Sequence, residues 1–573
     1  MKLRYLVEIT DPHTHMVKVK INAVRERETS NLKFFLPSWS PGSYLMREYA
    51  RNIRSIRAFN AGGEFLHLEQ TSKNVWELDF EKSQVKTESV EFSLEYEIFC
   101  HELTVRTSHV DYSHAFLHGP SYLMGVLERP MEEPEIEFKF PGLWSKLHTG
   151  LKDISEKRSS FVYTAKNYDE LIDAPVEIGC HESDGFMHQG KEHHVIWYGD
   201  QYPHKQDLKK DMQTIVETVS SHFKGDLPYD NYLFITHFIK DLYGGLEHLN
   251  STALQFDGRK LNNRKDYLNW MALVAHEYFH TWNVKRIRPK ELGPFDYVSE
   301  GYTRMHWLTE GLTSFMDDLF VYRAGLSSLE EYLGIIKDFL NKYFSIPGKK
   351  FHSLEESSFN AWVKLYRPDE NSNNSSISYY LKGGLVFSTL HFDLKKKGKS
   401  VNDLLDALWK RYLANPSEGV ESFEVLDMIE KIGGKDVREL FEMRISTTED
   451  IDFESYYKEA GCEFVWDETP APYLGANLLF QGDRAFVESV TLDSPAHKAG
   501  LNAGDEILAI DRIRFLKDDA DKFEEMLLPD QKYDFSIARL GKIFNVEIRA
   551  QKRPKLLKEI KVADRTKAQE VFR

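Results

Sequence analysis

The sequence has few cysteines, no long apolar run and no excess of basic residues, and each absence excludes a class of protein. Its three cysteines, Cys100, Cys180 and Cys462, are too few and too far apart for a disulfide framework. No apolar run reaches the ~20 residues that a membrane-spanning helix needs. Acidic residues outnumber basic ones by 90 to 74, for a net charge of -16, whereas nucleic-acid binding requires a basic surface. We therefore expect neither a membrane protein nor a nucleic-acid-binding protein.

The N-terminal residues also lack a targeting signal. MKLRYLVEITDPHTH alternates in polarity like a strand and has no apolar core of the roughly 7–15 residues that a secretory signal contains. The sequence as given therefore predicts a cytoplasmic protein, and sparse cysteines fit a reducing interior. A periplasmic location stays open, because a leader can be absent from a mature chain.

Changes of pattern divide the chain into four segments. Residues 1–168 alternate like strands, as in VEFSLEYEIF, and predict an all-β domain. Residues 169–460 carry apolar residues at helical spacing, as in VNDLLDALWKRYLA, and predict a mostly helical α+β domain. Strands return in 461–553, which predicts a small β-rich domain, and 554–573 reads as a basic, solvated tail. A chain of this length needs more than one core, so we expect a multidomain fold.

One apolar stretch, LVAHEYFHTWNV, contains two histidines and a glutamate. His276 and His280 are four residues apart, a spacing that places both imidazoles on one face of a helix. With Glu277 they form an HExxH pattern, which supplies two zinc ligands and a carboxylate that takes a proton from metal-bound water. The apolar neighbours predict a buried helix, where a low dielectric strengthens the electrostatics. The sequence thus predicts one zinc ion per chain.

A catalytic zinc site needs a third protein ligand, and two glutamates are candidates. Glu300 follows the turn-prone stretch ELGPFDY, whereas Glu310 lies in WLTEGLTSF, which has helical spacing. A rigid helix positions a ligand better than a loop does. Glu310 is therefore the preferred third ligand.

These motifs together resemble a known family. HEYFH followed by WLTEGLTSF is similar to the gluzincin metallopeptidases, in which a second helix supplies the third zinc ligand. SWSPGSYLMREYARNI, YGGLEH and YYLKGG extend the resemblance to the glycyl aminopeptidase family with a PDZ module, and they occur in the expected order. The resemblance covers nearly the whole chain. It implies a β-sandwich-like N-terminal domain, a thermolysin-like catalytic domain and a C-terminal PDZ domain.

The resemblance also implies catalytic roles. His276, His280 and Glu310 would bind the zinc ion. Glu277 would deprotonate the attacking water and later protonate the leaving amine. Tyr380 holds the tyrosine position of the family's Tyr-x-Lys-Gly motif and would donate a hydrogen bond to the oxyanion. The neighbouring Tyr379 is the competing candidate for that role.

Glu247 determines the substrate class that the resemblance implies. Related aminopeptidases hold the substrate's free amine with the glutamate of a Gly-x-Met-Glu-Asn segment. The segment here, GGLEH (244–248), keeps the first glycine and the glutamate but has Leu and His in place of Met and Asn. A carboxylate–ammonium hydrogen bond would select the first peptide bond. Gly244 and Gly245 would let the backbone approach the bound peptide closely.

The C-terminal segment resembles a PDZ domain in YLGANLL (473–479) and SPAHKAGLNAGDEILAIDRIRF (494–515). Tyr473, Leu474 and Gly475 match the carboxylate-binding loop, whose N–H groups would hold a peptide C-terminus by strand addition. A module that only packs on the catalytic domain is an equal alternative.

The sequence therefore predicts a zinc aminopeptidase acting on peptides with a free N-terminus, and the family implies small first residues, glycine or alanine. Two alternatives stay open: an endopeptidase on the same zinc site, and a non-catalytic protein whose PDZ module binds C-termini. Four more histidines lie close together in the sequence, but no cysteine or paired carboxylate supports a second metal site there; they are His101, His109, His114 and His118.

Overall fold

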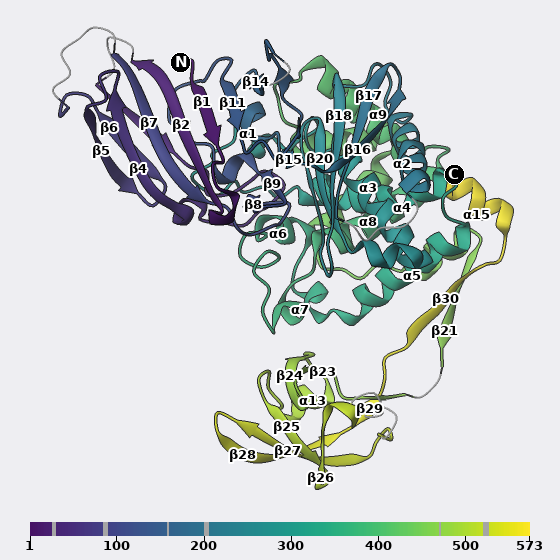
Figure 1. Ribbon diagram of the computed structural model, residues 1–573. Coiled ribbons are helices and arrows are strands. Elements are labelled where there is room, and N and C mark those ends of the chain that lie inside the picture. Colours follow the sequence, from purple (N-terminus) through teal and green to yellow (C-terminus); the bar gives the residue numbers. More distant parts are fainter. Residues whose placement is uncertain (26–29, 84–89, 158–159, 200–204, 469–470, 520–526) are drawn as a thin grey trace. The chain divides into compact units, whose positions relative to one another are not determined.

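The computed structural model describes residues 1–25, 30–83, 90–157, 160–199, 205–468, 471–519 and 527–573 (Figure 1). The chain forms two compact units, and each draws on separate parts of the sequence. Unit 1 comprises Met1–Tyr302, Arg323–Leu326 and Leu405–Glu421. Unit 2 comprises Thr303–Tyr322, Ser327–Leu404 and Ser422–Arg573.

An 11-stranded sheet forms much of the N-terminal part of unit 1, in the order β10-β3-β6-β5-β4-β7-β2-β1-β11-β14-β13. Alternation in the sequence determines which side chains it buries. Along β2, Val17, Val19, Ile21 and Ala23 are buried, and the residues between them are not. The β-rich N-terminal region expected from the sequence is thus present. Its strands are β1 (Arg4–Glu8), β2 (Met16–Arg25), β3 (Asn31–Phe35), β4 (Ile53–Asn60), β5 (Phe65–Ser72), β6 (Val75–Asp79), β7 (Val90–Phe99), β10 (Gly125–Val126), β11 (Glu135–Lys139), β13 (Lys152–Asp153) and β14 (Val162–Thr164).

Two smaller sheets complete the β structure of unit 1. The four-stranded sheet, β12-β15-β9-β8, pairs residues 176–179 with 114–117, so the N-terminal β structure continues past residue 168. The five-stranded sheet has the order β16-β17-β18-β20-β19, with β17, β18 and β20 parallel and β19 antiparallel at one edge. The strands are β8 (His109–Val110), β9 (His114–Leu117), β12 (Lys146–Thr149), β15 (Val176–Gly179), β16 (Glu182–His188), β17 (Lys191–Tyr198), β18 (Asn231–Phe238), β19 (Tyr243–Glu247) and β20 (Ser251–Phe256).

Helix α3 (Arg264–Phe279) packs against β19 and β20, and α2 (Lys205–Ser220) packs against α3 (Figure 1). The Asn263 side chain begins α3 by accepting hydrogen bonds from the backbone N–H groups of Lys265 and Asp266, which would otherwise lack helical partners. Most of α3 from Leu268 onward is buried, as expected of a helix that is apolar on nearly all sides. A short helix, α1 (Tyr168–Ile172), precedes β15.

Unit 2 is mainly helical up to residue 459. A π-helical turn, η6 (Trp307–Gly311), leads directly into α4, and α8 packs against η6. A capping box formed by Ser328 and Glu331 begins α5, so two N-terminal donors are satisfied reciprocally. The helices are α4 (Leu312–Arg323), α5 (Leu329–Ser345), α6 (Leu354–Phe359), α7 (Ser372–Ser375), α8 (Tyr379–Lys396), α9 (Val401–Ala414), which ends within unit 1, α10 (Ser422–Gly433), α11 (Lys435–Ser446) and α12 (Phe453–Glu459).

The C-terminal β-rich region has its own core, which includes Val487, Ile507, Phe535 and Ile548. Its sheet has the order β23-β24-β25-β27-β28, with β26 paired to β25 and β23 at an edge. The sequence prediction of a small β domain is consistent with this arrangement. The elements are β22 (Pro472–Tyr473), β23 (Ala476–Gln481), β24 (Arg484–Val490), α13 (Pro495–Ala499), β25 (Glu506–Ile510), β26 (Ile513–Arg514), β27 (Lys532–Arg539), β28 (Lys542–Arg549) and β29 (Gln551–Lys552).

The last residues are folded, which differs from the solvated tail expected for 554–573. Strand β30 (Leu556–Val562) pairs with β21 (Cys462–Asp467), and α15 (Arg565–Phe572) follows it. The Phe572 ring is buried and lies edge-on to Tyr332, with ring centroids 5.5 Å apart. Composition could not reveal this, because the apolar partners lie far away in the sequence. In the described part of the chain, no helix is both long and apolar enough to cross a membrane.

Candidate active site

The two histidines of the HExxH pattern lie at the C-terminal end of α3. His276 is in the last turn and His280 is the C-cap residue, still in the right-handed helical conformation. Their ring centroids are 4.7 Å apart and the ring planes are nearly perpendicular. His280 is buried, and His276 is partly exposed. The four-residue spacing therefore places both imidazoles on one face, as the sequence predicts.

A backbone hydrogen bond orients His280. Its Nδ1 lies 2.5 Å from the carbonyl oxygen of Asn283, and a carbonyl can only accept, so Nδ1 carries the proton. The remaining nitrogen, Nε2, then has a lone pair. Histidines that bind metals commonly donate their other N–H to a carbonyl or carboxylate in this way. The arrangement thus fits an imidazole that ligates a metal ion.

The Glu277 carboxylate lies directly against the edge strand β19. A Cβ at Gly245 would be 2.0 Å from Glu277 Oε1 and 2.3 Å from Cδ, far inside van der Waals contact. Only glycine allows this approach. Arg106 of the N-terminal sheet region donates a 3.1 Å hydrogen bond to the Gly245 carbonyl. The motifs in the sequence do not reveal Arg106, because it reaches the site from a loop far upstream.

Glu247 ends β19 and is buried close to Glu277. One carboxylate oxygen of Glu247, one of Glu277 and a ring nitrogen of His280 all lie within 4.8 Å of one another. Gly244 and Gly245 precede Glu247 in the same strand, and the outer edge of β19 pairs with no strand in the part of the chain that the structure describes. An extended peptide could therefore lie along this edge.

The backbone of Gly42 covers the Glu247 carboxylate. Gly42 has φ +82°, and a Cβ there would lie 2.4 Å from Oε1, 2.6 Å from Oε2 and 2.7 Å from Cδ of Glu247. The surrounding turn is held rigidly: Trp39 Nε1 donates to the carbonyls of Asp296 and Ser299, at 2.8 and 2.9 Å. The stretch SWSPGSY carries the resemblance to the family, but its contact with Glu247 spans some 200 residues and cannot be read from spacing.

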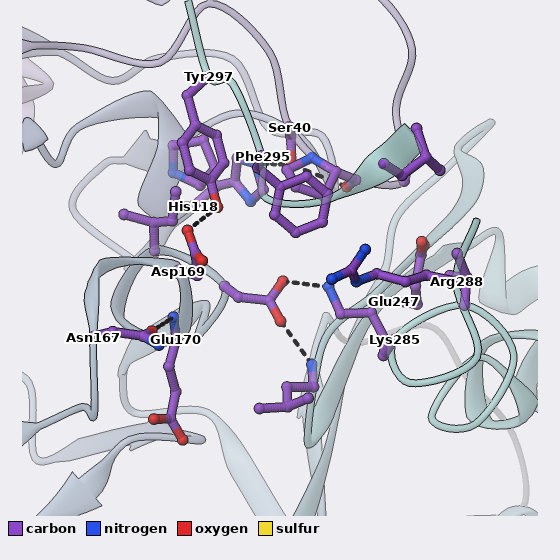
Figure 2. Close-up of a pocket in the computed structure, with 18 of the residues that line it drawn as sticks. Ser40, His118, Asn167, Asp169, Glu170, Glu247, Lys285, Arg288, Phe295 and Tyr297 are labelled. Atoms are coloured by element: carbon purple, nitrogen blue, oxygen red, sulfur yellow. Dashed lines mark hydrogen bonds and ion pairs between the residues drawn. The ribbon is translucent and has the colours of Figure 1, made fainter. Parts of the chain in front are cut away.

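A cavity of about 310 Å³ opens beside Glu247, between the N-terminal sheet region and the segment after α3 (Figure 2). An ion pair crosses it: Lys285 Nζ lies 2.8 Å from Asp173 Oδ1, and the His248 ring lies 3.1 Å from the same oxygen. Burial raises the pKa of Asp173, but Lys285 and His248 outweigh it and lower the pKa to about 2. The hydroxyl of Tyr297 also donates to Asp169, which lines the same cavity, at 2.7 Å.

In unit 2, Glu310 lies buried in the π turn η6. The following residue, Gly311, touches Gly383 of α8, since a Cβ at Gly311 would be 2.8 Å from Gly383 Cα. This contact between two glycines lets α8 pack closely against η6. Glu300 is exposed and lies outside any helix, which agrees with the preference for Glu310.

Tyr380 is near the start of the same helix, α8, and is partly exposed, whereas Tyr379 is fully buried. Burial raises the pKa of the Tyr380 hydroxyl well above its usual value, and the nearby Glu310 carboxylate raises it further. The hydroxyl therefore keeps its proton at neutral pH and can donate a hydrogen bond. Its greater exposure favours Tyr380 over Tyr379 as the group that reaches a substrate.

In the C-terminal domain, Tyr473, Leu474 and Gly475 lead into the edge strand β23. Gly475 has φ +77°, a conformation that favours glycine. Its carbonyl accepts a hydrogen bond from Thr491 N at 2.8 Å, and the Leu474 carbonyl accepts one from Ala496 N at 2.9 Å. These bonds hold the segment between β24 and α13.

Several known proteins are similar to this chain, and one of them is similar over its whole length. The model of the M61 glycyl aminopeptidase matches residues 269–386, and that of the Peptidase M61 N-terminal domain matches residues 4–180; neither reaches the C-terminal β-rich domain. An aminopeptidase N family protein from Idiomarina loihiensis is 27% identical, with a TM-score of 0.93 and 100% of both chains covered. An M1 zinc metallopeptidase from Deinococcus radiodurans is 12% identical, with a TM-score of 0.50 over 79% of this chain and 94% of its own, so it shares the fold. None of the curated proteins compared with the chain matches it.

The two family models include SWSPGSYLMREYARNI, HEYFH, WLTEGLTSF and YYLKGG, so the resemblance to the glycyl aminopeptidase family is confirmed for these segments. The chain belongs to the M61 glycyl aminopeptidase family and is a metallo-aminopeptidase, a hydrolase of peptide bonds.

Proposed function

We propose that this protein uses one zinc ion per chain to hydrolyse the first peptide bond of peptides with a free N-terminus. The observation that carries the proposal is the position of Glu247 beside two side chains of the HExxH pattern. One carboxylate oxygen of Glu247 lies within 4.8 Å of a carboxylate oxygen of Glu277 and of a ring nitrogen of His280. A substrate ammonium bound to Glu247 would form a charge-assisted hydrogen bond. It would also bring the first peptide bond, and no later one, to Glu277.

His276, His280 and Glu310 are the proposed zinc ligands. Two imidazoles and one carboxylate are a donor set of catalytic zinc sites, which leave a fourth position open. The hydrogen bond from His280 Nδ1 to Asn283 supports this role, because it directs the lone pair to Nε2. Bound zinc would supply Lewis-acid activation of water and of the scissile carbonyl.

Glu277 and Tyr380 are the proposed catalytic residues. Glu277 would accept a proton from the attacking water and pass it to the leaving amine. Its carboxylate lies against the Gly245 backbone, where a Cβ would be 2.0 Å from Oε1. Tyr380 would donate a hydrogen bond from its hydroxyl to the oxyanion that forms at the scissile carbonyl. The raised pKa of Tyr380 suits a hydrogen-bond donor.

Gly244 and Gly245 are proposed to bind the substrate backbone along the open edge of β19. The preference for glycine or alanine as the first residue rests on membership of the glycyl aminopeptidase family. A cytoplasmic location also belongs to this proposal. It is consistent with the three cysteines, which form no disulfide.

The C-terminal domain is proposed to be a PDZ module that binds a peptide C-terminus. Two features support this: β23 lies at a sheet edge, and the Tyr473–Gly475 segment before it includes a glycine with positive φ. A peptide carboxylate would bind the loop, and the peptide backbone would pair with β23.

Paired substrates test the peptidase proposal. Gly- and Ala-p-nitroanilide are compared with their N-acetylated forms, with and without a chelator, in wild type and in Glu247→Ala. We expect chelator-sensitive hydrolysis of the free-amine forms only, and a large loss of kcat/KM in the variant. Cleavage of acetylated substrates that survives Glu247→Ala would instead identify an endopeptidase. If the zinc-loaded protein cleaves neither the free-amine nor the acetylated substrates, the function would instead be peptide binding by the PDZ module.

A further inference from the structure

The hairpin formed by β8 and β9 brings together three metal-ligand side chains outside the peptidase site. The sequence HVDYSH places His109 in β8, Asp111 in the turn and His114 in β9. Each offers one ligand atom, and these atoms lie within 4.8 Å of one another. Asp111 lies between the two histidines in the sequence, and the hairpin that pairs Val110 with Ala115 brings the three side chains together.

Hydrogen bonds orient each of the three side chains. His109 Nδ1 lies 2.6 Å from the carbonyl oxygen of His101, so it carries a proton and Nε2 has the lone pair. His114 Nδ1 lies 2.7 Å from Glu177 Oε1, so the same assignment holds for this ring. Asp111 Oδ1 accepts from the backbone N–H of Ser113 at 2.7 Å, and Oδ2 faces His109 Nε2 at 3.5 Å. Histidines that bind metals have outer partners of this kind.

The Nε2 atom of His114 is the one proposed ligand atom of this cluster whose burial the described contacts do not explain. It is buried and has no hydrogen-bond partner among the residues that the structure describes, although leaving a buried polar atom without a partner is unfavourable. The side chain of His114 is 1% exposed, while those of His109 and Asp111 are 12% and 29% exposed. An ion could therefore reach the cluster from the side of Asp111.

We propose that His109 Nε2, Asp111 Oδ2 and His114 Nε2 bind a second divalent metal ion, separate from the HExxH site. Ligand atoms about 2.0–2.2 Å from a tetrahedral zinc ion lie roughly 3.3 Å apart. The distance of 3.5 Å between His109 Nε2 and Asp111 Oδ2 is close to this value. Calcium and magnesium prefer oxygen ligands. Two imidazoles and a carboxylate select a transition-metal ion such as zinc.

Glu177 and His237 support this site without ligating the ion. Glu177 Oε1 accepts from His114 and Oε2 from His237, at 2.7 and 2.9 Å, so both carboxylate oxygens make hydrogen bonds within a fully buried network. His114 belongs to β9 and His237 to β18, so the network joins two sheets of unit 1. An ion held by His114 is thereby coupled to the packing of both sheets.

The test is the zinc content of the full-length protein, measured by inductively coupled plasma mass spectrometry after saturation with zinc and desalting. We expect two zinc ions per chain in wild type and one in His276→Ala/His280→Ala, which lacks the proposed peptidase ligands. Adding Asp111→Ala to that variant should remove the last ion. His101→Ala is the matched control: it deletes a neighbouring histidine that is not a proposed ligand but keeps the backbone carbonyl that orients His109, so zinc content should not change.

Two further variants separate ligation from folding. His109→Ala changes a partly exposed side chain, and it should lose one zinc ion while retaining wild-type peptide hydrolysis, which reports an intact fold. Glu177→Gln should weaken zinc binding at this site by about 10–100-fold. A single zinc ion in wild type with none in His276→Ala/His280→Ala would overturn the second site and leave the peptidase site intact. Unchanged zinc content in Asp111→Ala would also overturn it.

Discussion

Replacing Gly42 with alanine tests how the N-terminal domain contributes to substrate binding. The new Cβ would lie 2.4–2.7 Å from the three carboxyl atoms of Glu247, whereas carbon atoms normally stay about 3.5 Å or more from such neighbours. The carboxylate must therefore move by about 1 Å. Misplacement of a binding group by about 1 Å can lower the rate by roughly 100-fold. We expect a loss of this size in kcat/KM for Gly-p-nitroanilide.

Backbone strain is the competing explanation, and Gly63 provides the control for it. Gly42 has φ +82° and Gly63 has φ +81°, but a Cβ at Gly63 would meet nothing within 4 Å. Both alanine variants thus carry a left-handed conformation that costs roughly 1–2 kcal/mol. Only the variant at Gly42 displaces Glu247. Thermal unfolding should show similar destabilisation in both, and kinetics should separate them.

The assay compares kcat/KM of the two variants with that of wild type, and then adds Gly42→Ala to Glu247→Ala. If the alanine acts through the carboxylate, it should have little further effect once the carboxylate is gone, because the two changes share one target. Equal activity of Gly42→Ala and Gly63→Ala would refute the reasoning. So would a full additional loss in the double variant.

Three further predictions concern unit 2 and the cavity. Tyr380→Phe should lower kcat by about 10²–10³ with little change in KM, and Tyr379→Phe is the control that should retain activity. Gly383→Ala places a Cβ 2.7 Å from Gly311 Cα; it should separate α8 from η6 and lower both Tm and kcat. Lys285→Met leaves Asp173 buried without its cation and should cost about 3–5 kcal/mol at pH 7, measured by denaturant unfolding. The pKa of Asp173 is about 2 in the folded protein and about 3.9 in the unfolded chain. The stabilisation of the wild type by Asp173 is therefore complete above pH ~4 and is lost as the pH falls through ~2. A free energy of unfolding that does not change with pH in that range would contradict this account.

Local features of the structure could be predicted from sequence because they depend on spacing. The interval between His276 and His280 is one helical turn, so any helix there places both rings on one face. The apolar residues around them predict a buried helix, and α3 is buried. The alternation of β2 similarly predicts which side chains enter the core. Such patterns need no knowledge of distant residues.

The C-terminal tail shows why composition misleads. Its many basic residues suggested a solvated extension, yet β30 pairs with β21 and Phe572 is buried. A few apolar residues suffice to fold such a segment when a complementary surface exists elsewhere in the chain. That surface is a property of tertiary structure, and charge counts do not contain it.

The sequence by itself determined the chemistry available to this protein: two imidazoles and a carboxylate on one helix, a glutamate beside two glycines, and a tyrosine at the start of another helix. Tertiary structure alone decided what those groups touch. Gly42 covers Glu247 and Arg106 reaches Gly245, and Asp111 joins two histidines through a hairpin. The reason is physical: helical and strand periodicity acts over a few residues. The contacts of Gly42 and Arg106 join segments far apart in sequence, and the contact of Asp111 depends on how two strands pair.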